Sequence, residues 1–442
     1  MTGRHTSRTL AAQVVTRVCE DRAFSQRALA SAFDAAPLEG RERAFATRLV
    51  YGTLTHLGRI DRILDGRLKK GLGSLKPALR DVLRVAVYQL VHEGEHVPPF
   101  AAVNEAVGHA RARHGRGAGN LVNAVLRGLQ RDIERSRVGP PESPAEEHGL
   151  RPWMWDLLVA QRGEEASEVM KVFNAPSPLH LRARSGDAAA LVEELGSCGV
   201  EASVHPIVPG CAVCRGGEAL RTAPVADGRA VVQDAGSQTV SLLVPHDALR
   251  VLDACAGIGG KTRHLLDLVS DRAVTSADIH ARKLAHLAQR VDEIDRLDTV
   301  RWTLPSDPPE AVRGSWDAVV LDAPCSALGT LGRHPEVRWT RSPGQVATLA
   351  ALQAQMLDAL APLVGEGGVL VYAVCTFTPE EGLENVRSFL GRWPSFRACR
   401  ADEVPSSLQV GLRWDDSTGG VRLWPDLHGT DGFQIFRLHR RS

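Results

Sequence analysis

The sequence has no long apolar run and no apolar core near its start. Its first ten residues, MTGRHTSRTL, lack the hydrophobic stretch of a secretory signal. No apolar run approaches the roughly 20 residues that a membrane-spanning helix needs. Eight cysteines in 442 residues are too sparse for a disulfide scaffold, and several fall in apparent core strands. We therefore expect a cytoplasmic protein, without membrane contact, that keeps its thiols reduced.

The ligands of a zinc site are also lacking. Cys211 and Cys214 have the spacing of a metal-binding pair, but no second cysteine pair or histidine pair follows nearby. Four zinc ligands cannot be assembled from this set. We expect no metal and interpret these two thiols as structural.

Net charge is nearly absent, at +1, but it is unevenly distributed. Residues 1–132 contain 21 Lys and Arg against 12 Asp and Glu, a net of +9, so the remainder carries a net of −8. A basic amino-terminal third suggests a polyanion-binding module attached to another domain. A charge run is more often a solvated surface, so the count by itself does not decide.

The length allows two or three domains with separate cores. In residues 1–132, apolar side chains recur at helical spacing, which predicts a small all-α bundle. Residues 133–150 are polar and proline-rich, as in a linker. Residues 151–230 mix one helical pattern with short extended stretches and predict a small α+β module. From 231 to 442, strands alternate with helical patterns, which predicts a doubly wound α/β sheet.

Two predicted strands of this sheet end next to a cysteine. The apolar run 318–321 leads into Asp322-Ala323-Pro324-Cys325, and the run 369–374 leads into Cys375. Open α/β sheets bind ligands at the carboxyl ends of their strands, so Asp322 and both thiols are expected over one crevice. Most free cysteines are small buried hydrophobes, and that reading stays open on these two strands taken singly.

A glycine-rich loop, ACAGIGGKT (254–262), follows the predicted strand 249–253. It is not a phosphate-binding P-loop, because Cys255 stands where glycine is required, and Thr262 departs from the dinucleotide fingerprint. A turn that lets backbone amides approach a ligand remains, with Asp278 at the next strand end to accept hydrogen bonds from ribose hydroxyls. That arrangement suits S-adenosylmethionine; an ordinary strand–helix turn is the alternative.

Together these segments resemble the RNA cytosine-5 methyltransferase family. The family's cofactor loop DxCAAPGGKT corresponds to 253–262, its first cysteine motif DAPCSGxG to 322–329, and its second cysteine motif to 372–376. The element before its catalytic domain and its closing HGTDGF correspond to 233–238 and 428–433. The amino-terminal bundle resembles the NusB-like RNA-binding domain, in segments 50–52, 79–80, 88–90, 97–99, 102–106 and 122–127. This fusion points to the RsmB/Sun branch, which modifies small-subunit ribosomal RNA.

The resemblance implies a Rossmann-like class I methyltransferase domain that methylates carbon 5 of a cytosine in 16S ribosomal RNA. Cys375 would add to carbon 6 of the base, Cys325 would assist product release, and Asp322 would stabilise charge on the ring. The expected partner is small-subunit ribosomal RNA or its precursor, bound by a monomer. The expected cofactor contacts are Cys255, Ala256, Gly257, Ile258, Gly259, Gly260, Lys261, Asp278 and Asp322.

The sequence departs from the family pattern at three places. Gly257-Ile258 replaces Ala-Pro, and Val374 replaces threonine. The predicted third strand, 299–304, ends in Leu304 where the family has an aspartate near the adenine amino group, and Asp307 is the nearest substitute. Two alternatives remain: a non-catalytic RNA-binding or ribosome-assembly factor, and the same chemistry on transfer RNA or large-subunit RNA.

Overall fold

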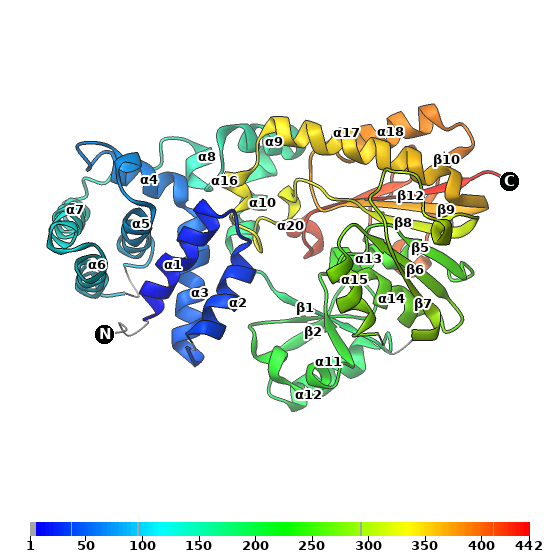
Figure 1. The fold of residues 1–442 in the computed structure, drawn as a ribbon, viewed down its shortest axis with the longest axis horizontal. Coiled ribbons are helices and arrows are strands. Elements are labelled where there is room, and N and C mark those ends of the chain that lie inside the picture. Colours follow the sequence, from blue (N-terminus) through cyan, green and yellow to red (C-terminus); the bar gives the residue numbers. More distant parts are fainter. Residues whose placement is uncertain (1–5, 37, 95–96, 292–293, 410) are drawn as a thin grey trace. The chain divides into compact units, whose positions relative to one another are not determined.

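The computed structural model describes residues 6–36, 38–94, 97–291, 294–409 and 411–442 (Figure 1). The chain forms two compact units. Unit 1 comprises residues 1–174 and 331–341, and unit 2 comprises residues 175–330 and 342–442. Residues 151–174, which the sequence pattern groups with the α+β module, are helical and belong to unit 1. The predicted combination of a helical bundle, a small α+β module and a Rossmann-like α/β sheet is confirmed.

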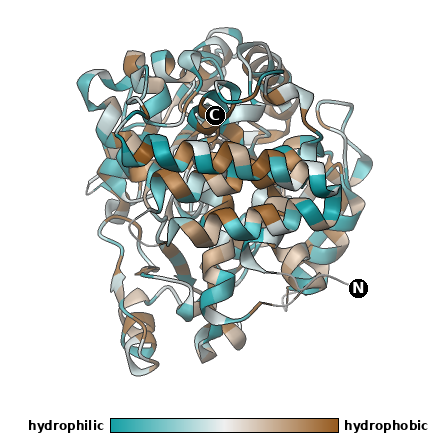
Figure 2. Ribbon diagram, turned by 90° about the vertical axis from the view of Figure 1, so that its left-hand side faces the viewer, coloured by the Kyte–Doolittle hydropathy of each residue, from teal (hydrophilic) through white to brown (hydrophobic). Residues whose placement is uncertain are grey.

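Unit 1 is helical, and its helices bury one apolar face each, as the sequence spacing predicts. Figure 2 shows hydrophobic and hydrophilic positions alternating around the helices of this unit that face the viewer. Prolines open several of its helices at their first positions, where no backbone N–H is needed. Its helices are α1 (Ser7–Glu20), α2 (Ser25–Ala35), α3 (Gly40–Thr55), α4 (Leu57–Asp65), α5 (Pro77–His92), α6 (Pro99–His114), α7 (Arg116–Glu134), α8 (Pro144–Glu147), α9 (Pro152–Arg162), α10 (Ala166–Asn174) and α16 (Val337–Thr340).

The polar segment 133–150 is bound to the bundle rather than free. Arg62 of α4 donates to the carboxylates of Glu142 and Glu146 and to the carbonyl oxygen of Pro140. Residues 331–341, far along the chain, also pack in unit 1. The fully buried guanidinium of Arg338 donates to the carbonyl of His148, and the indole of Trp339 donates to that of Leu54.

Unit 2 begins with a small antiparallel sheet in the order β2-β3-β1-β4. Cys211 and Cys214 lie on β3, three residues apart, so they face opposite sides of the sheet and enter different apolar clusters. The elements of this part are β1 (Leu179–Ala183), α11 (Ala188–Ser197), β2 (Ala202–Val204), β3 (Cys211–Cys214), α12 (Ala223–Ala226) and β4 (Ala230–Val232).

The larger sheet of unit 2 has the order β10-β12-β9-β8-β5-β6-β7, with β11 paired to β12. Strands β9, β8, β5, β6 and β7 are parallel, whereas β12 runs antiparallel to β9. Its elements are α13 (Ala235–Leu242), β5 (Arg250–Asp253), α14 (Gly260–Leu268), β6 (Ala273–Asp278), α15 (Ala281–Ala288), β7 (Leu297–Arg301), β8 (Trp316–Asp322), α17 (Pro343–Leu360), β9 (Val364–Val374), α18 (Leu383–Arg392), β10 (Phe396–Ala398), α19 (Ser406–Gln409), β11 (Gly420–Leu423), α20 (Pro425–His428) and β12 (Phe433–Arg440).

Helices cover both faces of this sheet (Figure 1), and alternate residues of β8 bury against them. On β8, Val319 and Leu321 join the core beneath α17 and α18, whereas Ala318 and Val320 join the core beneath α13 and α14. Helix α17, continued to Leu363, is also long and apolar enough to cross a membrane by length and composition. One such helix is weak support for a span, because core helices of the same length pass that test.

The third parallel strand differs from the sequence prediction. We predicted residues 299–304, but β7 spans Leu297–Arg301. Trp302 and Leu304 leave the strand and bury their side chains in the core beneath α17, and the Trp302 indole donates to the carbonyl of Ser306 at 3.0 Å. Leu304 is therefore a core residue, while Asp307 is exposed.

A buried hydrogen-bond chain joins β5, α14 and β6. The Thr262 hydroxyl donates to the carboxylate of Asp253 at 2.7 Å and lies 2.8 Å from the hydroxyl of Ser276. All three side chains are fully buried. Burial disfavours the charged carboxylate and raises the pKa of Asp253 to about 6.

Replacing Asp253 by asparagine should make stability less dependent on pH. The folded carboxyl holds its proton up to about pH 6, whereas an unfolded aspartate loses it near pH 3.9, so the contribution of Asp253 is lost as pH rises through that window. Urea unfolding should show the stability of the native protein falling, relative to Asp253→Asn, by roughly 2–3 kcal/mol from pH 4 to pH 7.5. The control Asp298→Asn, on the exposed side of β7, should show no such trend. A pH-independent difference for Asp253→Asn would contradict this account.

Candidate functional site

Two thiols meet at the carboxyl ends of the neighbouring strands β8 and β9. Asp322 ends β8 and pairs with Ala373 of β9, so the loops that follow both strands leave the sheet side by side. Cys325 and Cys375 lie on these loops, with their Sγ atoms 3.2 Å apart. Both side chains are partly accessible. The structure therefore brings together the three residues that the sequence predicted for one crevice.

An ion pair lies in the same crevice. The Lys261 ammonium of α14 is 2.5 Å from a carboxylate oxygen of Asp322. Burial opposes the charge on Lys261, but the Asp322 carboxylate outweighs it, so the pKa of Lys261 is raised. The hydrogen bond with Cys325, burial and the negative charge of Asp322 raise the pKa of the Cys375 thiol, whereas the Lys261 ammonium lowers it. Lys261 is thus the cation that favours a thiolate at this position.

The glycine-rich loop connects β5 to α14 and needs left-handed backbone at two positions. Gly257 has φ 60° and Gly259 has φ 84°, values that side-chain-bearing residues rarely adopt. A Cβ atom on Gly259 would lie 2.0 Å from the Leu287 side chain, so the loop also requires this close approach to α15. Around Gly257 and Gly260 there is open space instead.

Asp278 ends β6 and orients this loop. Its carboxylate accepts hydrogen bonds from the backbone N–H groups of Gly257 and His280, at 3.0 and 2.8 Å, and the Lys283 ammonium is 3.8 Å away. Each oxygen keeps a second lone pair for a further donor. Asp278 is buried, with 7% of its surface exposed.

Some residues in and beside the glycine-rich loop are exposed, and others are buried. Ile258 is 59% exposed and Ile279, directly after Asp278, is 47% exposed. Ile279 is not among the residues predicted from the sequence, where it is marked only as an apolar residue that follows an acid at a strand end. Cys255 packs against the core, and burial raises the pKa of its thiol. Ala256 is buried and its N–H donates to the carbonyl of Ala277, so both residues support the loop.

A buried polar network lies beneath the two thiols, and sequence reasoning assigned it no role. The hydroxyls of Ser326 and Thr376, each directly after a cysteine, are 2.8 Å apart. Glu381 accepts from the Ser326 N–H at 2.8 Å, and the Gln353 amide of α17 donates to Glu381 at 3.0 Å. All four side chains are fully buried. Gln353 is one of several polar residues of α17, with Gln345, Gln355 and Asp358, and the sequence does not distinguish it from them.

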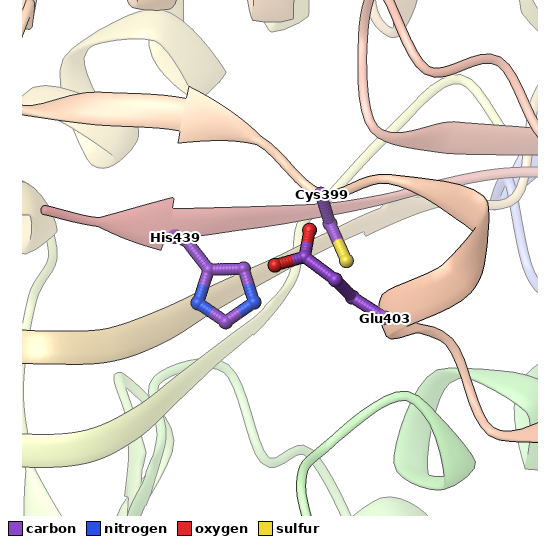
Figure 3. A group of neighbouring side chains, drawn as sticks. All are labelled: Cys399, Glu403 and His439. Atoms are coloured by element: carbon purple, nitrogen blue, oxygen red, sulfur yellow. The ribbon is translucent and has the colours of Figure 1, made fainter.

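A second group of potential ligands lies away from this crevice. Cys399, Glu403 and His439 point toward one another (Figure 3), with ligand atoms within 4.8 Å. Arg397 already donates to both carboxylate oxygens of Glu403, at 2.6 and 2.8 Å. Burial and the positive charges of Arg437 and Arg397 lower the pKa of His439. A cation would have to displace this guanidinium, so we assign no metal to the group.

Comparison with known proteins identifies both parts of the chain. Residues 240–439 match the model of 16S rRNA methyltransferase RsmB/F, and residues 5–131 match that of the NusB family. The "Ribosomal RNA small subunit methyltransferase B" of Pseudomonas putida is 30% identical, covering 98% of each chain. The "Probable ribosomal RNA small subunit methyltransferase B" of Bacillus subtilis is 29% identical, covering 98% of this chain and 99% of the relative.

The fold also matches a solved structure along its whole length. The crystal structure of PH0851 superimposes with a TM-score of 0.82 at 24% identity and covers 99% of each chain. The family match, the NusB match and this fold confirm the resemblance inferred from the cysteine motifs. The chain belongs to the RsmB/F family of 16S rRNA methyltransferases.

Proposed function

We propose that this enzyme transfers a methyl group from S-adenosylmethionine to carbon 5 of a cytosine in 16S ribosomal RNA. The reaction would proceed through a covalent bond between Cys375 and carbon 6 of the base. The observation that carries the proposal is the pair of thiols at 3.2 Å, at the ends of adjacent parallel strands. A single buried thiol would need no such partner, and this pair lies beside an acid and a cation.

The residues of the glycine-rich loop fit S-adenosylmethionine. The N–H groups of Gly257 and Gly259 are bonded to Asp278 and to the Ala256 carbonyl, and this turn leads into the start of α14, where a helix favours an anionic group such as the cofactor carboxylate. Asp278 retains acceptor sites for ribose hydroxyls, and the exposed Ile258 and Ile279 offer apolar surface to the adenine. We assign cofactor binding to 255–261, Asp278 and Asp322. When bound, the cofactor supplies an electrophilic methyl group.

Cys375 acts as the nucleophile in this proposal. Carbon 5 of cytosine is a poor nucleophile, and addition of a thiolate to carbon 6 moves electron density from the ring double bond to carbon 5. The Cys375 thiol first releases its proton to solvent, and Lys261 stabilises the resulting thiolate. Asp322 is placed to hydrogen-bond the polar edge of the base and stabilise the charge that develops on the ring.

Cys325 takes part in release. After methylation, carbon 5 still carries its proton, and Cys325, as thiolate, removes that proton. The electron pair of the carbon–hydrogen bond then restores the double bond between carbons 5 and 6, and Cys375 leaves carbon 6 as a thiolate. Both sulfurs must therefore reach neighbouring ring atoms, as their contact distance allows.

RNA binding is assigned to residues 1–132, which carry a net charge of +9. Ribosomal RNA loops present unstacked bases that can enter the crevice at modest cost. We propose a cytoplasmic monomer acting on small-subunit RNA or its precursor. Of the alternatives, a non-catalytic assembly factor is disfavoured by the intact thiol pair, Lys261 and Asp322. The same chemistry on another RNA would be revealed by bisulfite sequencing of cellular RNA from a deletion strain.

Substitution of the two cysteines should give opposite adduct behaviour. Cys375→Ala should abolish methylation and form no covalent complex with RNA, because no other thiol reaches carbon 6. Cys325→Ala should form the complex but fail to resolve it, since the proton on carbon 5 lacks its acceptor. Denaturing gels with labelled RNA would measure both. A covalent complex formed by the variant that lacks both cysteines, or normal turnover by Cys325→Ala, would contradict these roles.

Gly259→Ala should weaken cofactor binding and stability together. The added methyl group meets Leu287 and the backbone has φ 84°, so the loop must shift, at a cost of about 1–3 kcal/mol. Gly391→Ala is the matched control, because that position in α18 has open space and lies outside the cofactor loop. Calorimetry with S-adenosylmethionine and thermal unfolding would compare the two variants. Equal affinity in both would argue against a requirement for left-handed backbone at Gly259.

The basic junction between α6 and α7 should contribute to RNA binding. Arg111, Arg113 and Arg116 are exposed, and none has an ion-pair partner in the described part of the chain. Replacing all three by glutamine should reduce the slope of log affinity against log salt by about 2 to 3 if each contacts a phosphate. Arg400→Gln, an exposed arginine paired with Asp402, is the control. An unchanged slope would place the phosphate contacts elsewhere on unit 1.

A further inference from the structure

The two thiols are held by loops that follow different strands. Cys325 lies three residues beyond the end of β8, whereas Cys375 directly follows β9. Strand pairing positions the roots of these loops but does not fix their conformations. The sulfur atoms are nonetheless in contact, at 3.2 Å. Interactions between the loops themselves must therefore hold them at this separation.

The side chain of Glu381 forms hydrogen bonds with both cysteine loops. It belongs to the Cys375 loop, yet one of its carboxylate oxygens accepts from the N–H of Ser326, the residue after Cys325, at 2.8 Å. Its other oxygen accepts from the Thr378 hydroxyl of its own loop, also at 2.8 Å. One side chain thus joins the backbone of the first cysteine loop to the turn of the second.

Gln353 of α17 supports the same connection from below. Its amide nitrogen donates to Glu381 at 3.0 Å and to the carbonyl of Pro324, the residue before Cys325, at 2.9 Å. Its amide oxygen accepts from the Tyr372 hydroxyl of β9 at 3.2 Å. The peptide groups on both sides of Cys325 are therefore held by side chains outside its own loop.

The Glu381 carboxylate is fully buried, and within the described residues it forms no ion pair. Three donors from three different elements satisfy it: the Ser326 amide, the Gln353 amide and the Thr378 hydroxyl. Burying a carboxylate is costly unless such donors compensate it, and hydrogen bonds to a charged acceptor are stronger than neutral ones. These three hydrogen bonds join Glu381 to the Cys325 loop, to α17 and to its own loop.

We propose that Glu381 is a positioning residue that sets the distance between the Cys325 and Cys375 thiols, and thereby the rate of adduct release. This inference rests on the proposed function. Cys375 can reach carbon 6 without Cys325, but removal of the carbon 5 proton requires Cys325 to reach the adjacent ring atom. Loss of Glu381 therefore slows proton removal and departure of Cys375 more than it slows formation of the sulfur–carbon bond.

The test compares three substitutions at this position. Glu381→Met keeps the volume but removes both acceptors, and Glu381→Asp keeps the charge but shortens the side chain. Glu381→Gln retains an oxygen for Ser326 and Gln353, while the Thr378 hydroxyl can turn to accept from the new amide. The adjacent Glu380→Ala, at an exposed site, is the matched control. If Glu381→Met fails to fold, the aspartate variant carries the test.

Adduct kinetics provide the first readout. Single-turnover reactions with RNA and S-adenosylmethionine would give separate rates for covalent-complex formation and loss. In Glu381→Met and Glu381→Asp, loss should slow by about tenfold or more relative to formation, since small misplacements of reacting groups have effects of this order. Glu381→Gln and Glu380→Ala should keep the native ratio. Equal slowing of both steps, or no recovery with glutamine, would overturn the proposal.

Thiol geometry provides a second readout that does not require catalysis. A short bifunctional thiol reagent such as dibromobimane, followed by peptide mapping, reports how readily Cys325 and Cys375 are bridged. Bridging should be efficient in the native protein and in Glu381→Gln, and reduced in Glu381→Met. If Glu381→Met shows reduced bridging but the native protein forms no covalent complex with RNA, the covalent mechanism is refuted and the positioning role is retained. Unchanged bridging in Glu381→Met would refute the positioning role itself.

Discussion

Parallel pairing of β8 with β9 places Asp322 opposite Ala373, and the geometry of the crevice depends on this register. Because both strands run in the same direction, the loops that follow them leave the same edge of the sheet, where each delivers one thiol. A shift by one residue would turn Asp322 away from Lys261 and separate the sulfurs. The register is secured by apolar side chains on both faces of β8, which enter two separate cores. Hydrophobic burial therefore sets the positions of the reacting groups.

Electrostatics within the crevice follow from that placement. A thiol at the end of a buried strand, beside another thiol and a carboxylate, resists ionisation. Lys261 offsets this resistance, and it can do so because α14 begins directly after the glycine-rich loop and points its first turn at β8. The loop that is proposed to hold the cofactor thus also positions the Lys261 ammonium, which favours a thiolate at Cys375. Left-handed backbone at Gly259 serves both tasks, because Gly259 is the N-cap residue from which α14 begins.

The strand–loop units of the site could be predicted from the sequence because their signals are local. Apolar runs broken by proline or glycine located β5, β8 and β9 to within a few residues, and the acid at the end of β6 was evident. The end of β7 could not be predicted, because Trp302 and Leu304 continue the apolar pattern of the strand. They lie beyond its last residue, with their side chains buried in the core. Gln353 lies roughly thirty residues from Cys325, and nothing local in the sequence indicates that its amide bonds the Pro324 carbonyl. Contacts of this kind depend on how α17 packs against the sheet.

The Cys325 loop and the segment that follows it along the chain belong to different units. The polypeptide leaves unit 2 after Thr330, five residues beyond Cys325, and residues 331–341 are part of unit 1. There Arg338 and Trp339 donate to backbone carbonyls of the helical unit, and Glu336 accepts from the N–H of Ser25. The Cys325 loop is held at one end by β8 and at its other end by Gly329, whose N–H donates to the Cys375 carbonyl at 3.0 Å and whose carbonyl accepts from the Gly432 N–H at 2.7 Å. Between these anchors its conformation is set by Glu381, Gln353 and the Ser326–Thr376 hydrogen bond. A short loop fixed at both ends loses little conformational entropy on binding substrate, so the thiol it carries can be held ready before the RNA arrives.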